Sequence, residues 1–183
     1  NDAQVFKEYV NKTLGVPQEN IIFLLDAKTV EMNRSIEKLN LIAKNSNGDC
    51  ELIFYYAGHG LPDEVTKEAY IMPVDVSGTD LKFAVKVNDL YKKLTQYPSK
   101  KVCVFLDACF SGGARNSALV NARGVKIKPK TDVVSGNIVI FTASSGEQSS
   151  LPYKEKQHGM FTYFLLKKLQ ETNGNITYSE LCD

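Results

Sequence analysis

Two segments of the chain end in a reactive side chain at a glycine-containing turn. The segment "ELIFYYAGHG" (51–60) carries His59, and "KVCVFLDACFSGG" (101–113) carries Cys109. An imidazole beside a thiol can accept its proton, and the resulting thiolate can attack a carbonyl carbon. The same imidazole can then protonate a leaving amine. Together the two residue types are the minimum set for acyl transfer.

The residues next to this pair could also stabilise the negative charge that acyl transfer creates. Gly60 follows the histidine, and a glycine lets another backbone segment approach closely. The backbone amides of Gly60 and Cys109 could then both donate to a developing oxyanion. Each residue also has an ordinary interpretation, because a loop histidine is often structural and a free cysteine often packs as a small hydrophobe. Their joint occurrence at two strand ends favours catalysis.

Motifs for other common chemistries are absent from the sequence. It contains no G-x-x-x-x-G-K-[ST] phosphate loop and no G-x-S-x-G nucleophile turn. The four cysteines form no C-x-x-C pair, and His59 and His158 are the two histidines, so a zinc cluster is not expected. We expect Cys50 and Cys103 to be inert core thiols and His158 to be a surface residue at a helix start. The sequence therefore predicts no metal site.

Alternating helix and strand patterns must position the reactive pair. Apolar residues at helical spacing, or short continuous apolar runs, distinguish the two kinds of element. Helices are predicted at 2–14, 29–44, 87–94 and 159–170, and strands at 21–25, within 51–60, at 69–75, within 101–113 and at 137–144. This order predicts an α/β fold, a three-layer sandwich whose mostly parallel central sheet is flanked by helices, over one domain at 1–183. Ligands of such sheets bind beyond the carboxyl ends of the strands, where His59 and Cys109 are expected to meet.

The composition is that of an ordinary soluble globular domain. The 183 residues include 22 Lys and Arg against 21 Asp and Glu, so no strong charge of one sign points to nucleic acid or anionic lipid. No apolar run approaches the roughly 20 residues that span a bilayer. We therefore expect no nucleic-acid or membrane partner, with the cytoplasm as the default compartment. Because the chain opens at Asn1 without methionine, we expect a domain trimmed at both ends.

The two segments together resemble those of the caspase-like cysteine peptidases. The caspase signature places a histidine about 50 residues before Q-A-C-[RQG]-G, and His59 stands about 50 residues before Cys109 in "DACFSG". The patterns Y-x-A/S-G-H-G and D-x-C-x-S-G are closer to metacaspases and their bacterial relatives. Weaker similarities lie in "YIMPVD", "NIVIFTASSGEQSS", "GMFTYFLL" and "ITYSEL". The resemblance implies a cysteine endopeptidase with His59 as general base and acid, Cys109 as nucleophile and no obligatory third catalytic residue.

Asp107 marks the difference from true caspases, which have glutamine at this position. Two residues before Cys109 on a strand, its side chain is expected on the same face as the thiol. A carboxylate there favours a Lys or Arg substrate side chain by charge pairing, and the metacaspases, which have aspartate here, cleave after Arg or Lys. They also have an acidic residue where Asp2 stands. Asp2 is therefore expected to form a second wall of the substrate pocket, to cap a helix, or to do both.

Other positions depart from the metacaspase pattern. Ala57 stands where many members have serine, which would reshape the specificity pocket. Asn88 and Asp89 match one calcium-binding pair, but Asn116 replaces an expected aspartate. Hard cations need several oxygen ligands, so we expect no tight calcium dependence and no other cofactor. The resemblance further implies protein or peptide substrates and a monomer.

A polar, basic stretch at 114–136 lacks periodicity and is predicted to be a loop. Proteolytic nicking concentrates at loop tips, so an enzyme that prefers basic residues could process itself here. The candidate cleavage sites are Arg115, Arg123, Lys126, Lys128 and Lys130. The alternative is a solvated loop with no role in activation.

Two other classes of function compete with peptidase. A caspase-like fold can serve as a catalytically silent interaction module, but the presence of both His59 and Cys109 argues against that function. Another acyl-transfer or thiol-redox enzyme could use the same sheet. A redox enzyme would need a resolving cysteine near Cys109, and the sequence places none there.

Overall fold

A parallel sheet forms the centre of the protein. The structure is a computed structural model and describes residues 2–110, 136–143, 152–153 and 158–182. Its main sheet has the order β1-β5-β6, in which β1 (Glu51–Ala57), β5 (Lys101–Asp107) and β6 (Ile138–Thr142) all run parallel. The predicted α/β class and mostly parallel sheet are confirmed.

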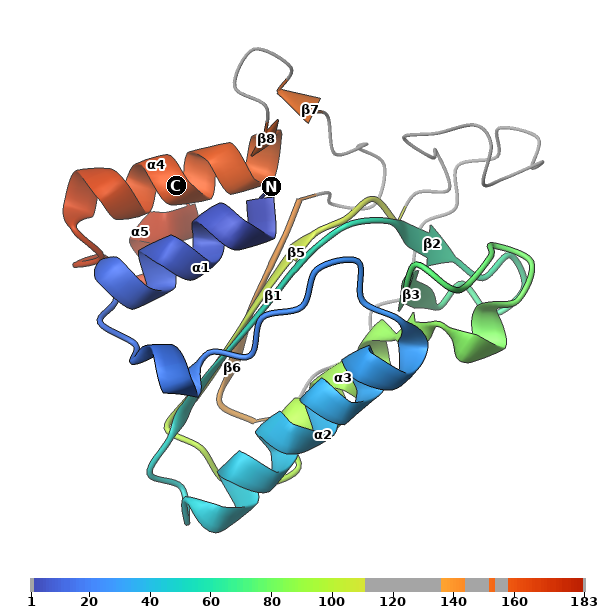
Figure 1. Cartoon of the computed structure of the whole chain (residues 1–183), viewed down its shortest axis with the longest axis horizontal. Coiled ribbons are helices and arrows are strands. Elements are labelled where there is room, and N and C mark those ends of the chain that lie inside the picture. The colour runs from blue at the N-terminus through green and yellow to red at the C-terminus, as the bar shows by residue number, and fades with distance from the viewer. Residues whose placement is uncertain (1, 111–135, 144–151, 154–157, 183) are drawn as a thin grey trace.

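Helices cover both faces of this sheet (Figure 1). On one face lie α1 (Asp2–Lys12), α4 (Met160–Thr172) and the short α5 (Tyr178–Cys182). On the other face lie α2 (Thr29–Asn45) and α3 (Val87–Leu94). Each face has its own buried hydrophobic cluster, one shared with α2 and α3 and one with α1 and α4. The result is the expected three-layer sandwich.

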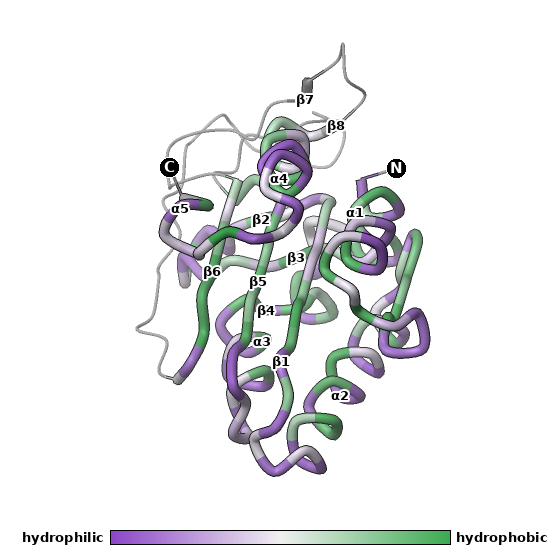
Figure 2. The backbone as a smooth tube through the Cα atoms, turned by 90° about the vertical axis from the view of Figure 1, so that its left-hand side faces the viewer, coloured by the Kyte–Doolittle hydropathy of each residue, from purple (hydrophilic) through white to green (hydrophobic). Residues whose placement is uncertain are grey.

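Strand β5 is buried on both sides, which explains why its sequence is an unbroken apolar run. Val102, Val104 and Leu106 belong to the cluster under α2 and α3. Cys103 and Phe105 belong to the cluster under α1 and α4. Successive side chains of a strand point to opposite faces, so a central strand covered on both faces needs apolar residues throughout. Figure 2 shows this hydrophobic strand between the amphipathic helices.

A second, antiparallel sheet follows the end of β1. It has the order β2-β3-β4 and comprises β2 (Gly60–Pro62), β3 (Ala69–Ile71) and β4 (Val85–Lys86). The remaining short elements are two 3₁₀ turns, Gln18–Asn20 and Leu81–Phe83, and the hairpin of β7 (Pro152–Tyr153) and β8 (His158–Gly159).

Two of the predicted strands need correction. The prediction of a strand at 21–25 is wrong, because among the described residues this segment pairs with no other strand; it packs Ile21 against the α1–α4 cluster and Phe23 under Lys7 of α1. The strand predicted at 69–75 ends at Ile71. Pro73 has no backbone N–H to donate to a ladder, so regular pairing stops before it. Both errors arise because an apolar run indicates burial, whereas a strand also requires a hydrogen-bonding neighbour.

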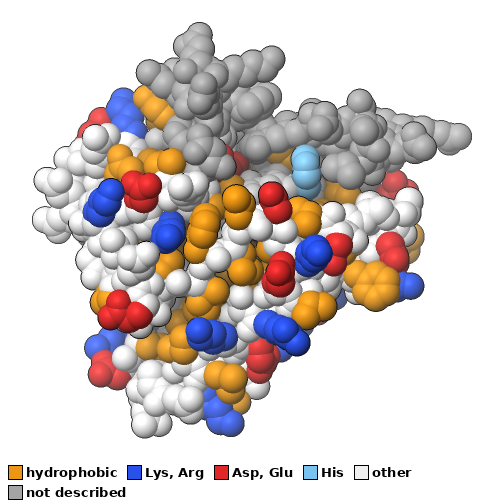
Figure 3. Space-filling view, viewed as in Figure 1, with side chains coloured by type: hydrophobic (Ala, Val, Ile, Leu, Met, Phe, Trp, Pro, Cys, Tyr) orange, Lys and Arg blue, Asp and Glu red, His pale blue; other side chains and the backbone are white. Residues whose placement is uncertain are grey.

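The near balance of basic and acidic residues in the sequence is visible on the surface. On the face shown in Figure 3, acidic and basic side chains are interspersed. None of the helices in the described part of the chain is long and apolar enough to cross a membrane.

The predicted cleavage sites Arg115, Arg123, Lys126, Lys128 and Lys130 lie outside the described residues.

Candidate active site

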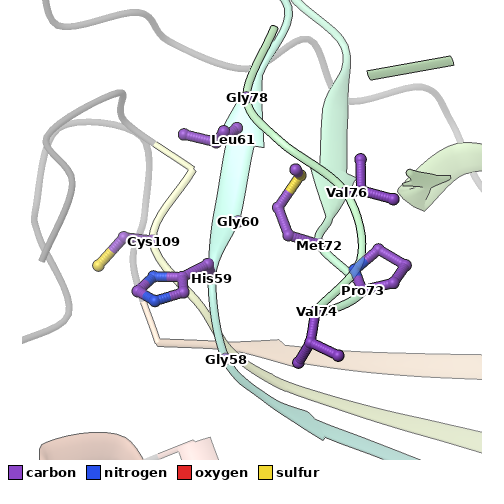
Figure 4. A pocket seen from close by; sticks show the side chains of 10 residues that line it. All are labelled: Gly58, His59, Gly60, Leu61, Met72, Pro73, Val74, Val76, Gly78 and Cys109. Carbon is purple, nitrogen blue, oxygen red and sulfur yellow. The ribbon is translucent and has the colours of Figure 1, made fainter. Parts of the chain in front are cut away.

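The pairing of β1 with β5 brings His59 and Cys109 to one edge of the sheet. Ala57, the last residue of β1, is the direct partner of Asp107, the last residue of β5. His59 and Cys109 each lie two residues beyond these partners, and the Gly58 N–H donates to the Asp107 carbonyl oxygen at 3.1 Å. Both side chains line one cavity (Figure 4). The parallel arrangement therefore places a thiol and an imidazole at the same strand ends.

Gly60 is required by the close approach of the two segments. A Cβ atom at this position would lie 2.5 Å from the Phe110 ring and 2.9 Å from the Cys109 carbonyl oxygen. Real Cβ atoms do not approach other atoms so closely. The segment after β1 therefore packs directly on the backbone of the cysteine, and only glycine fits at the contact.

The direction of the Gly60 amide follows from the β2–β3 ladder. Gly60 is opposite Ile71, and the preceding pair, His59 and Met72, is joined by a 3.0 Å bond from the Met72 N–H to the His59 carbonyl. In an antiparallel ladder, hydrogen-bonded and non-hydrogen-bonded pairs alternate. The Gly60 N–H therefore points away from β3. The Gly60 N–H is therefore not used in the β2–β3 ladder.

Tyr56 holds the backbone of His59 in place. Its hydroxyl oxygen lies 2.8 Å from the His59 carbonyl and 3.0 Å from the Met72 carbonyl, and the Met72 N–H donates to it at 3.2 Å. Its single proton can be donated to only one of these carbonyls at a time. Burial raises the pKa of Tyr56 to about 12, so the hydroxyl stays neutral. A Cβ at Gly58 would lie 2.5 Å from this hydroxyl, so a larger residue there would have to displace the Tyr56 side chain.

Asp107 is fully buried and bound to helix α4. It continues the face of β5 that packs against α1 and α4, and 0 % of it is exposed. Its Oδ2 atom accepts from the Thr162 hydroxyl at 2.6 Å and from the Thr162 N–H at 3.3 Å. Because the Thr162 hydroxyl donates its proton to Asp107, it accepts from the Tyr55 hydroxyl, 2.7 Å away. The bonds Tyr55–Thr162–Asp107 thus join β1, α4 and β5.

The two carboxylates that the sequence predicts for substrate binding converge on Gly159. The Gly159 N–H donates to Asp2 Oδ2 at 3.0 Å. A Cβ on Gly159 would lie 2.2 Å from Asp107 Oδ2, so this carboxylate packs against the same residue. Asp2 opens helix α1 and Gly159 immediately precedes α4. The structure therefore brings Asp2 and Asp107 to one place at the start of α4.

The cysteines differ in their surroundings. Cys103 lies in the core, and burial raises its pKa to about 12, so this thiol has almost no thiolate at neutral pH. Cys109 is 6 % exposed and lines the cavity together with His59. Among the described residues, no group of three or more His, Cys, Asp and Glu side chains could hold a metal ion.

The sequence patterns did not predict a role at the site for three residues, Tyr55, Tyr56 and Thr162. Tyr55 and Tyr56 were part of an apolar strand, and Thr162 was part of an amphipathic helix. A usable signal existed for the tyrosines, because a hydroxyl buried in a strand must find a hydrogen-bond partner. For Thr162 the sequence offered no such signal, since its partner Asp107 is 55 positions away.

Comparisons with known proteins agree with this architecture. The family model for the caspase domain of the C14 peptidases matches residues 1–183. The chain belongs to this caspase-domain family. No curated protein sequence matches it.

A solved structure shows the same fold at low sequence identity. A Geobacter sulfurreducens protein of known crystal structure superposes with a TM-score of 0.55 at 20 % identity, over 81 % of this chain. The match covers 65 % of the Geobacter chain, so this chain spans less than two thirds of that protein. The likeness concerns the fold alone.

Proposed function

We propose that this chain is a cysteine endopeptidase that uses His59 and Cys109 as a catalytic dyad. The observation that carries the proposal is the register of β1 and β5, which places these two residues equally far beyond paired strand ends and against one cavity. Membership of the caspase-domain family supports the same chemistry. No third catalytic side chain is required, because the imidazole can serve as both base and acid.

The reaction proceeds through an acyl-enzyme. His59 takes the proton from the Cys109 thiol, and the thiolate attacks the peptide carbonyl carbon to give a tetrahedral oxyanion. The amides of Gly60 and Cys109 donate to this oxyanion. When the C–N bond breaks, the imidazolium gives its proton to the departing amine. Water then attacks the thioester, its proton passes through His59 to the released thiolate, and the carboxylic acid product leaves.

Cleavage after Arg or Lys is the specificity that we propose. Its support is the convergence of Asp2 and Asp107 at Gly159, which concentrates acidic side chains at the start of α4. A guanidinium or ammonium group pairs with carboxylates by charge-assisted hydrogen bonds. This specificity is that of metacaspases rather than of true caspases, whose aspartate substrates would be repelled.

Peptide hydrolysis tests the function and the specificity together. Fluorogenic peptides ending in Arg, Lys or Asp are incubated with the wild type, Cys109→Ala and His59→Ala, with calcium or a chelator. We expect cleavage after Arg and Lys, its loss in both variants, and no dependence on calcium. Cleavage only after Asp would overturn the specificity. Equal hydrolysis by wild type and Cys109→Ala would overturn the dyad, and no hydrolysis by the wild type would favour a silent interaction module.

Self-processing in the basic stretch is part of the same proposal. An enzyme that cleaves after basic residues is expected to cut its own 114–136 segment, whose candidate sites are Arg115, Arg123, Lys126, Lys128 and Lys130. Intact mass spectra recorded over time should show fragments in the wild type and none in Cys109→Ala. Identical intact masses in the two proteins would contradict self-cleavage.

A further inference from the structure

An apolar cavity extends from His59 toward the loop after β3. Its volume is about 220 Å³, and besides His59, Cys109 and three glycines it is lined by Leu61, Met72, Pro73, Val74 and Val76. Among the described residues, its lining includes no Lys, Arg, Asp or Glu. For comparison, an engineered apolar cavity of about 150 Å³ is large enough to bind benzene. The space beside the imidazole is therefore sufficient for a large apolar side chain.

The cavity lies on the opposite side of the dyad from the two acidic residues. In Figure 1 the ends of β1 and β5 lie between the start of α4, where Asp2 and Asp107 meet, and the β2–β3 sheet. In the view of Figure 4 the imidazole of His59 and the thiol of Cys109 lie on one side of the backbone through Gly58 and Gly60, and the side chains of Met72, Pro73 and Val74 lie on the other side, while all of them line the same cavity. A bound peptide crossing the dyad would therefore reach an acidic region on one side and an apolar one on the other.

The chemistry decides which part of the substrate meets each side. The imidazole must protonate the amine that leaves, so the residue bearing that amine lies against His59. The acyl part of the substrate stays bonded to Cys109, and the side chain of the substrate residue before the scissile bond extends toward Asp107. Resting on the proposed peptidase function, we propose that the cavity is the subsite for the residue immediately after the scissile bond and that it takes a large apolar side chain, such as Leu, Met or Phe.

The lining favours this class of side chain over the others. Transfer of an apolar side chain from water into the cavity is favourable in proportion to the area it buries. A charged side chain would lose hydration and find no charged partner among the lining residues that the structure describes. Alanine would leave most of the cavity unfilled. The subsite therefore selects for size and for lack of charge.

The loop that forms the cavity wall is anchored before any substrate binds. The Val74 N–H donates to the Ala27 carbonyl at 3.0 Å. The next residue, Asp75, accepts bonds from the Thr29 N–H at 2.8 Å and the Thr29 hydroxyl at 3.1 Å. These bonds tie the loop to the start of α2 and engage the Asp75 carboxylate there. A wall fixed in this way lowers the ordering cost of binding.

The test varies one position of an otherwise constant substrate. In these internally quenched peptides, the residue before the scissile bond is the one that the first assay identifies. The residue after the scissile bond is Leu, Ala, Lys or Asp. We expect kcat/KM for Leu to exceed that for Ala by about tenfold or more, with Lys and Asp below Ala. Val74 is 60 % exposed, so Val74→Asp adds a charge to the cavity rim without disturbing the core, and it should abolish the preference for Leu. The matched control is Val65→Asp, at a valine that is 88 % exposed and outside the lining, and it should keep the preference.

The outcomes separate this inference from the function on which it rests. Hydrolysis of all four peptides at similar rates would overturn the subsite and leave the peptidase intact. A preference for Lys or Asp, or a Leu preference that survives in Val74→Asp, would do the same. Hydrolysis of none of them would overturn the proposed function and the subsite with it.

Discussion

Replacing Thr162 by valine tests the hydrogen bonds that hold Asp107. Valine has nearly the shape of threonine, so the change removes the hydroxyl and little packing volume. Asp107 would lose the 2.6 Å bond from this hydroxyl and keep the 3.3 Å bond from the backbone N–H. Tyr55 would lose its 2.7 Å partner. The loss at Asp107 falls on a fully buried side chain, where water cannot easily replace the bond, whereas Tyr55 is partly buried.

The expected cost follows from the nature of the bond. A hydrogen bond to a charged group contributes about 1.5–3 kcal/mol. We therefore expect Thr162→Val to lower the free energy of unfolding by about 2 kcal/mol. For a domain of this size, 1 kcal/mol corresponds to about 2–4 °C in Tm, so the transition should fall by about 4–8 °C.

The assay compares two valine substitutions in the same helix. Thr172, also in α4, donates to the Lys168 carbonyl one turn earlier at 2.9 Å, a neutral local bond. Thr172→Val should lower stability by no more than about 1 kcal/mol. Urea denaturation followed by circular dichroism measures both variants. If Thr162→Val is no less stable than Thr172→Val, the hydroxyl does not support Asp107 and this interpretation of the site is wrong.

Three further predictions concern the residues around the dyad. Gly60→Ala forces a Cβ against Phe110 and the Cys109 carbonyl, so peptidase activity should fall by about 100-fold or more; an active Gly60→Ala would refute the close approach. Tyr56→Phe removes the hydroxyl that bridges His59 and Met72, and we expect a loss of about 1 kcal/mol in chemical denaturation; unchanged stability would count against this role. Burial raises the pKa of Cys103 to about 12, which leaves only about one molecule in 10⁴ as thiolate at pH 8, so iodoacetamide should label Cys109 well before Cys103 in peptide maps of the folded protein. Faster labelling of Cys103 would contradict its buried position.

The layers of the fold and the placement of His59 and Cys109 at one edge of the sheet could be predicted because their sequence signals are local. The apolar run of β5 indicates a strand buried on both faces, and the chain has Val102 and Cys103 on opposite faces as that interpretation requires. Parallel pairing then carries the ends of β1 and β5 to one edge. The position of His59 and Cys109 at the same edge follows from this rule without any knowledge of long-range packing.

The surroundings of the dyad could not be predicted because they depend on distant partners. Gly159 donates to Asp2 across 157 positions, and no local pattern specifies such a contact. Strands β2 and β3 have three residues each and β4 has two, which is too short for a period to be visible. The segment at 21–25 shows the reverse case, since its apolar pattern is clear but the described structure gives it no ladder partner.

Covalent trapping of the nucleophile tests the central claim most directly. The protein is incubated with a peptide ketone inhibitor that ends in Arg and alkylates an active-site thiol, and the adduct is located by mass spectrometry. We predict one adduct per chain on Cys109, formed by the wild type and lost in His59→Ala, while an inhibitor ending in Asp reacts far more slowly. An adduct on another cysteine, or equal labelling of wild type and His59→Ala, would contradict the dyad.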